Sequence, residues 1–329
     1  MKNVLKNRII MKRLAVMAVA VALVYFFWNQ GIGNLFIMKL RSTKLLTFAV
    51  ISISTAFATV SFQTIVHSNF LTPSILGVES FYRLLQTVLM FFSFSLLGSQ
   101  LNAEWQFVFL VFLMLGSYFL LYRLSWNRKN YDMQIILMIG LVMGTFFNSI
   151  SSFMQVLMDP NEYDKLQTKL YASFQNINDS VLVLAVPIAM FSIISLWRKR
   201  KVLEVMGLGT QTAKNLGISV EKETKLTFMH VILLMTVSAA LVGPMMFLGF
   251  VAANIAYRLF RTYCLNYLLP GASLLSFVMV VAGQFLAEEV FKLQTNLSIL
   301  VELFGGIYFF GYYGRKGVSY ENQSCQQSL

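Results

Sequence analysis

The sequence predicts an all-α protein that crosses a membrane about ten times, as a single membrane-spanning domain over residues 1–329. Three observations carry this prediction. Of the 329 residues, 57% are hydrophobic and only 12% are charged, about half the charged share of a soluble domain. The mean hydropathy is +0.67, and the apolar residues come in runs long enough to span a bilayer. This composition excludes a soluble globular enzyme, a disordered chain and a disulfide-stabilised scaffold.

Ten apolar runs define the predicted helices. The first run follows five basic residues between Lys2 and Arg13, and we expect a retained helix there because no cleavage pattern of a signal peptide follows it. Gly243-Pro244 divides one long run into the seventh and eighth helices, since proline interrupts a helix. The predicted spans are 14–28, 45–66, 81–97, 105–122, 133–158, 181–197, 226–242, 245–259, 269–291 and 297–313.

The basic residues predict that both termini are cytoplasmic. Lys and Arg are enriched in the cytoplasmic loops of membrane proteins, and this arrangement places 20 of the 26 Lys and Arg residues inside. The net charge of +12 therefore reflects topology, and nucleic acid is not an expected partner. Lys39, Arg41 and Lys44 are the exception, because they lie on the outer side just before the second predicted helix.

The one long cytoplasmic connection, at about 198–225, carries its own short helical pattern. A loop with internal structure often docks a partner, and the alternative is a solvated amphipathic linker. The residues alone leave both interpretations open. The candidate docking residues are Gly207, Leu208, Gly209, Thr210, Ala213, Leu216 and Gly217.

Side chains for catalysis, metal binding or nucleotide binding are scarce. Two histidines, His67 and His230, and two cysteines are too few for a metal site or a disulfide framework, and we expect both histidines to be packed or interfacial. The glycine spacing of a phosphate-binding loop occurs at 306–311, but Tyr312 stands where that loop needs lysine. We therefore expect no enzyme activity and no cofactor bound by this chain.

Gly140 and Gly144 form a small-xxx-small motif in the fifth predicted helix. Such a motif lets another helix approach closely. A contact with a helix of the same or another subunit is one interpretation, and chance composition is the other.

Glu302 lies inside the tenth apolar run, where a charged side chain is costly and tends to face a bundle interior or water. It either lines a pathway or is satisfied near the outer end by Lys292 and interfacial water. Gln63, Gln155 and Asn254 are further candidates for a pathway or for hydrogen bonds between helices.

Six sequence blocks follow one another along nearly the whole chain. They are Arg41-Ser-Thr-Lys44, Gln63, Leu71-Thr-Pro-Ser-Ile-Leu-Gly77, the segment 207–217, Gly243-Pro-Met-Met-Phe-Leu-Gly-Phe-Val251 with Asn254, and Gly305-Gly306. Each block is a weak signal by itself. In this order they resemble the FecCD-type permeases of ABC importers, which carry iron–siderophore complexes and cobalamin.

The resemblance implies a permease with the fold of cobalamin-importer permeases, working as one of a pair in the bacterial cytoplasmic (inner) membrane. Two ABC ATPase subunits would bind ATP on the cytoplasmic side, and a periplasmic or lipid-tethered siderophore-binding protein would dock outside. Arg41 and Lys44, with Lys292, become docking residues for acidic groups of the binding protein. The segment 207–217 becomes the coupling element that contacts the ATPase.

Two departures from the family pattern refine these expectations. Lys44 replaces a second Arg and Thr43 replaces Pro, which weakens bidentate carboxylate pairing. Asn254 stands where cobalamin-type members have His, and its surroundings resemble the branch that serves catecholate or mixed-chelate siderophores. That branch often pairs two different permeases, so we expect a heterodimer that imports a ferric siderophore. The alternative is an ion- or proton-coupled secondary transporter that uses Glu302.

Overall fold

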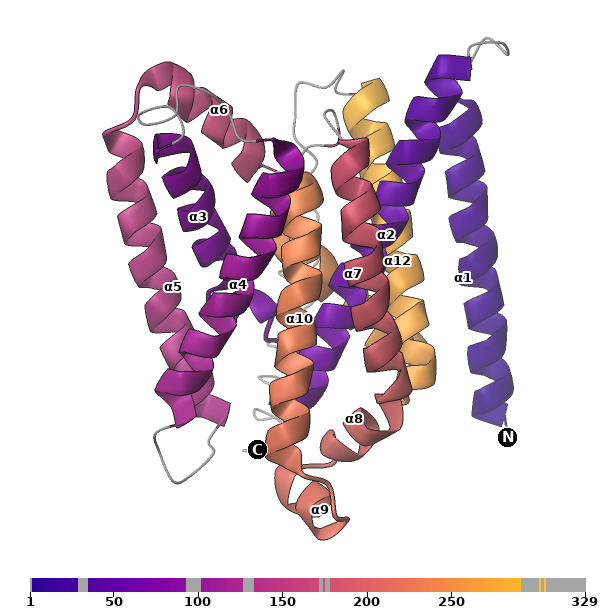
Figure 1. Ribbon diagram of the computed structural model, residues 1–329. Helices are drawn as coiled ribbons and strands as arrows, with labels where there is room; N and C mark the ends of the chain where they lie inside the picture. Colours follow the sequence, from indigo (N-terminus) through magenta and orange to yellow (C-terminus); the bar gives the residue numbers. More distant parts are fainter. Residues whose placement is uncertain are drawn as a thin grey trace, which may run out of the picture.

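The computed structural model describes residues 2–28, 35–92, 102–126, 133–171, 174, 178–290, 302 and 305. Within them the chain forms a bundle of helices that run side by side (Figure 1). The elements are α1 (Lys2–Phe27), α2 (Leu35–Val66), the 3₁₀ turn η1 (Pro73–Leu76), α3 (Val78–Phe92), α4 (Ala103–Trp126), α5 (Met133–Val156), α6 (Pro160–Leu170), α7 (Asp179–Arg198), α8 (Arg200–Met206), α9 (Thr210–Asn215), α10 (Val220–Val242), α11 (Met246–Phe260), α12 (Leu265–Phe285) and the π-helical turn η3 (Leu286–Val290).

Helices occupy nine of the ten predicted spans. Six of them, α1, α2, α5, α7, α10 and α12, contain apolar stretches long enough to cross a membrane. The other three, α3, α4 and α11, coincide with the third, fourth and eighth predicted spans. The tenth predicted span lies outside the described residues apart from Glu302 and Gly305. The count of ten and the location of the C-terminus therefore stay predictions.

Burial separates the central helices from the peripheral ones. In α10, 78% of the apolar stretch is buried, and in α2 the share is 72%. The same share is only 17% in both α1 and α5, which stand on opposite sides of the bundle (Figure 1). α2 and α10 therefore form the core, on which α7, α11 and α12 pack.

The central helix α2 packs closely on α11 because small residues line the contact. A Cβ atom added to Gly249 of α11 would lie 2.8 Å from the carbonyl oxygen of Thr55 in α2. The Thr55 hydroxyl is satisfied within its own helix, donating to the carbonyl of Ile51 at 2.9 Å, as Thr side chains in apolar helices often do. Small residues of this kind allow helix backbones to approach in a membrane.

Two elements differ from the sequence prediction. α2 begins at Leu35 rather than near residue 45, so the basic cluster Lys39, Arg41 and Lys44 is part of the helix and not of a preceding loop. The helix α6 was not predicted. Asp159 caps it, its carboxylate accepting from Asn161 N at 2.9 Å, and it covers the end of the bundle opposite α9 (Figure 1).

The long predicted connection folds into two short helices, α8 and α9, instead of one. The break falls at Gly209, whose φ of 113° is a left-handed conformation that favours glycine. Gly217, with φ of 81°, turns the chain into α10. α9 lies at the same end of the bundle as the N-terminus and extends beyond the other helices (Figure 1).

Candidate functional site

A cleft of 630 Å³ opens near the end of the bundle that carries α8 and α9. Its walls come from the end of α2, the loop that follows α2, the α8–α9 segment, α11 and the start of α12. The lining includes amide, imidazole, phenol, guanidinium and carboxylate groups. They belong to Gln63, Asn69, Asn254, His67, Tyr257, Tyr263, Arg258 and Glu204.

Gln63 and Asn254, two of the predicted pathway residues, meet in the wall of this cleft. Both side-chain amides donate to the backbone carbonyl of Asn69, Gln63 at 2.9 Å and Asn254 at 3.2 Å. Gln63 also donates to the carbonyl of Leu71, and Asn254 to that of Phe250. One carbonyl oxygen of the loop therefore joins α2 to α11. The two amide side chains line the cleft and also form hydrogen bonds between elements.

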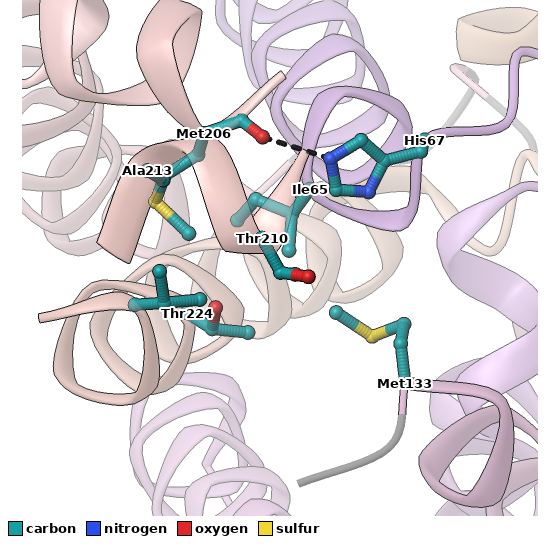
Figure 2. Close-up of a pocket in the computed structure, with 8 residues that line it drawn as sticks. Ile65, His67, Met133, Met206, Thr210, Ala213 and Thr224 are labelled. Atoms are coloured by element: carbon teal, nitrogen blue, oxygen red, sulfur yellow. Dashed lines mark hydrogen bonds between the residues drawn. The ribbon is translucent and has the colours of Figure 1, made fainter. Parts of the chain in front are cut away.

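His67 connects the end of α2 to the end of α8. Its Nε2 lies 2.8 Å from the carbonyl oxygen of Met206 (Figure 2). Because a carbonyl can only accept, Nε2 carries the proton in this contact. The residue has φ of 57°, and the sequence did not single it out as functional, since its partner is a backbone atom distant in the chain.

The predicted coupling residues divide into an exposed tip and a buried base. Leu208 is 69% exposed and Leu216 is 63% exposed, whereas Ala213 is completely buried. Thr210, Gly207 and Gly217 are exposed, and Gly209 is partly so. A protein that covered these two leucines would remove apolar surface from water, which is favourable, and whether a partner does so stays a prediction.

The base of this segment is fixed to the core by charged side chains. Lys199 pairs with Glu223 of α10 at 2.6 Å. Glu204 accepts a hydrogen bond from the backbone N–H of Leu265 at 2.6 Å, which satisfies one of the free donors at the start of α12 and places a negative charge at a helix N-terminus. These two contacts join the base of the segment to α10 and α12.

At the opposite end, the predicted docking cations have partners within the chain. Arg41 Nη1 donates to the carbonyls of Tyr25 and Trp28 at 2.6 and 2.9 Å, closing the end of α1. Lys44 forms an ion pair with Glu288 at 2.6 Å, and Glu288 also accepts from the Tyr25 hydroxyl. Lys292 lies outside the described residues. A docking role for these cations stays a prediction.

Gly140 and Gly144 are in close contact with the turn η1 of the same chain. A Cβ atom on Gly140 would lie 2.8 Å from the Cα of Leu76, and one on Gly144 would lie 3.2 Å from the Cα of Gly77. Gly77 itself has φ of 74°. The motif therefore provides space for a tight turn of the same chain.

The other polar candidates have different surroundings. Gln155 donates to the hydroxyls of Thr87 and Ser151 at 3.1 and 3.0 Å, so it joins α5 to α3. Glu302 is exposed, and Arg83 is close enough to interact with it electrostatically.

Comparison with known proteins gives one family. The model of the FecCD transport family matches residues 9–314. The petrobactin import system permease protein YclO of Bacillus subtilis (strain 168) is 38% identical over 300 residues, which cover 91% of this chain and 95% of the relative. The petrobactin import system permease protein FatC of Bacillus anthracis is 32% identical over 273 residues, covering 83% and 77%.

Solved structures share the fold. A metal-chelate type ABC transporter in an inward-facing conformation superposes with a TM-score of 0.83 at 19% sequence identity, covering 94% of this chain and 99% of the other. The similarity at this level of identity concerns the fold alone.

Proposed function

Because the chain belongs to the FecCD transport family, a family of membrane-embedded transport subunits, we propose that it is the permease of an ATP-driven importer of ferric siderophores. The observation that carries the proposal is the match over residues 9–314 together with 38% identity to a permease named for petrobactin import. Three of the relatives carry that name. We therefore propose iron bound to a catechol-containing siderophore as the cargo, in the bacterial cytoplasmic membrane.

The proposed topology has ten spans with both termini in the cytoplasm. The N-terminal end of α1 and the α8–α9 segment lie at the same end of the bundle (Figure 1). Both are rich in Lys and Arg, which are typical of cytoplasmic segments. Cysteine at Gln167 should react with an impermeant thiol reagent in intact cells, and cysteine at Arg200 should not. Labelling at Arg200 would contradict this orientation.

The cleft is proposed to be the cytoplasmic mouth of the transport path. It opens toward the side where the ATPases would bind and is built from α2, α11, α12 and the α8–α9 segment. An inward-facing relative shares the fold, which supports this assignment. The permease performs no chemistry: ATP binding to the partner subunits and docking of the loaded binding protein must favour different permease conformations, or no transport follows.

The proposed complex contains a second FecCD-type permease of different sequence, two ABC ATPase subunits and a siderophore-binding protein. The exposed Leu208 and Leu216 support an ATPase contact. Arg41, Lys44 and Lys292 are proposed to meet acidic residues of the binding protein. For Lys44 this requires exchange of its partner Glu288.

Purification of the tagged chain from its own membranes, followed by mass spectrometry, tests the proposal. An ATPase subunit with a Walker motif and a second permease should co-purify. Cells lacking the gene should lose uptake of radioactive iron supplied as ferric petrobactin and keep uptake of iron supplied as ferric citrate. Isolation without an ATPase, together with unchanged petrobactin-dependent uptake, would refute the proposal.

A further inference from the structure

A second cavity, lined by apolar side chains, lies between α1 and α12. It has a volume of 370 Å³, and its walls are formed by α1 between Ala20 and Tyr25 and by α12 and η3 between Val281 and Leu286. Both helices are membrane spans, so the cavity faces the hydrocarbon region. Ala20 and Ala282 help to leave it open because their side chains are small.

Aromatic side chains and a cation lie at the end of this groove away from the N-terminus. The Trp28 ring packs edge-on against Phe285, with centroids 5.2 Å apart. The Arg41 guanidinium lies over the Tyr25 ring, 5.5 Å from its centroid. Trp and Tyr at the ends of spans are typical of the headgroup region of a bilayer. The groove therefore starts at headgroup level and continues into the apolar interior.

The charges around this end leave Arg41 able to bind an anion. Within the part of the chain that the structure describes, its hydrogen bonds go from Nη1 to the carbonyls of Tyr25, Phe26 and Trp28. A guanidinium has five N–H donors, so Nε and Nη2 can serve a ligand. Lys44 is neutralised by Glu288, while Lys39 is exposed on the same helix as Arg41. Glu289 is exposed on η3, so an anion is expected on the α2 side.

From this juxtaposition we propose that α1, α2 and α12 bind one anionic phospholipid, with an acyl chain in the groove and the phosphate at Arg41. A phospholipid combines a long apolar chain with a phosphate, the two features that the groove and the guanidinium recognise. Arg41 is one of the cations that contradict the positive-inside rule, and in this proposal a lipid of the membrane itself is its ligand. Arg41 is also part of the docking proposal, and lipid binding is measured on the complex freed of binding protein, so the two are tested separately.

Native mass spectrometry of the full chain, in its complex after the binding protein has been removed, tests the site with two probes. The protein is titrated with dioleoyl phosphatidylglycerol or with dioleoyl phosphatidylcholine. We expect the anionic lipid to be retained about fivefold better, which corresponds to about 1 kcal/mol for one basic residue at the membrane surface. Arg41→Gln should abolish this preference, and Arg41→Lys should keep it.

The groove is tested with a matched pair of substitutions on α1. Ala20→Phe fills the groove and should lower retention of both lipids. Val19→Phe adds the same ring at the neighbouring exposed position, which does not line the groove, and should leave retention unchanged. Equal retention of the two lipids by the unmodified protein, or equal effects of the two phenylalanines, would overturn the proposal. These comparisons still decide the outcome if Arg41→Gln fails to fold.

Discussion

The two ends of the bundle present their candidate contact residues in opposite ways. At the end with α9, Leu208 and Leu216 are mostly exposed. At the other end, Arg41 and Lys44 are bound to carbonyls and to Glu288 of the same chain. Covering an exposed leucine with a partner protein is favourable, because it removes apolar surface from water. A paired cation, in contrast, must exchange one partner for another. The first kind of surface suits a lasting contact, and the second suits a reversible one.

The largest effect is expected from Leu208→Glu. In the proposed ATPase contact this substitution would bury an unpaired charge, at a cost of several kcal/mol. The purified permease should retain its thermal stability, since Leu208 is exposed in the chain itself, and should lose the ATPase or its stimulation by loaded binding protein. ATP hydrolysis per purified complex is the measurement, and normal stimulated turnover would mean that this segment is not the contact.

Ala213→Glu provides the contrasting control within the same segment. Ala213 is completely buried by its own chain, so the charge should destabilise the permease before any partner binds. Its yield and thermal stability should fall, unlike those of Leu208→Glu. Similar behaviour of the two variants would remove the distinction between tip and base.

A smaller effect is expected from Glu204→Ala at the base of the segment. Loss of the acceptor leaves the Leu265 N–H without its partner, and a hydrogen bond to a charged group contributes about 1.5–3 kcal/mol. Thermal unfolding should occur at lower temperature, and stimulated ATP hydrolysis should fall although the ATPase still binds. Glu204→Gln keeps a hydrogen-bond acceptor, so its stimulated ATP hydrolysis should lie between that of the unmodified protein and that of Glu204→Ala. Equal stimulation in all three proteins would argue against coupling through this contact.

At the opposite end, exchanging Lys44 and Glu288 should cost little. Both side chains are partly exposed, and such ion pairs contribute about 0.2–1 kcal/mol. Lys44→Glu and Glu288→Lys should each lower the unfolding temperature slightly, and the double exchange should recover most of the loss. Additive losses in a double-mutant cycle would show that the pair does not stabilise the fold.

The smallest effect is expected from removing the charge of Glu288. Glu288→Gln releases Lys44, so the affinity for separately purified binding protein should rise at low salt, by no more than about fivefold. At 1 M salt, where the Debye length is about 3 Å, the gain should disappear. A loss of affinity would mean that Glu288 itself contributes to docking.

The sequence predicts the apolar helices well because their signal is local. Gly243-Pro244 correctly separates α10 from α11, since both residues disfavour helix continuation. The predicted start of α2 was wrong because Lys39, Arg41 and Lys44 interrupt the apolar run. In the folded chain, backbone carbonyls at the end of α1 bind Arg41, and the Glu288 carboxylate pairs with Lys44. Such compensation comes from distant parts of the chain and has no local signature.

The site is predictable only in part for the same reason. The glycines at 209 and 217 favour turns because glycine adopts positive φ at little cost. Both have positive φ in the folded chain. The partner of the glycine motif in α5 was not predictable, because only the folded chain brings η1 against Gly140. The contact of His67 with Met206 is likewise tertiary. Residue type and spacing indicate which segments matter, and the fold decides what each contacts.

The attachment of α1 has a consequence for how the protein is made. The helix is the most peripheral together with α5, and the Tyr25 hydroxyl that helps to hold it finds its acceptor on Glu288, 263 residues later in the chain. At about 5–20 residues per second, the ribosome needs on the order of 10–50 seconds to supply that acceptor. During this interval α1 is inserted in the bilayer without α12. The first span to be synthesised is thus held early only at its end, by Arg41, and gains its main packing partner, α12, when most of the chain has been made.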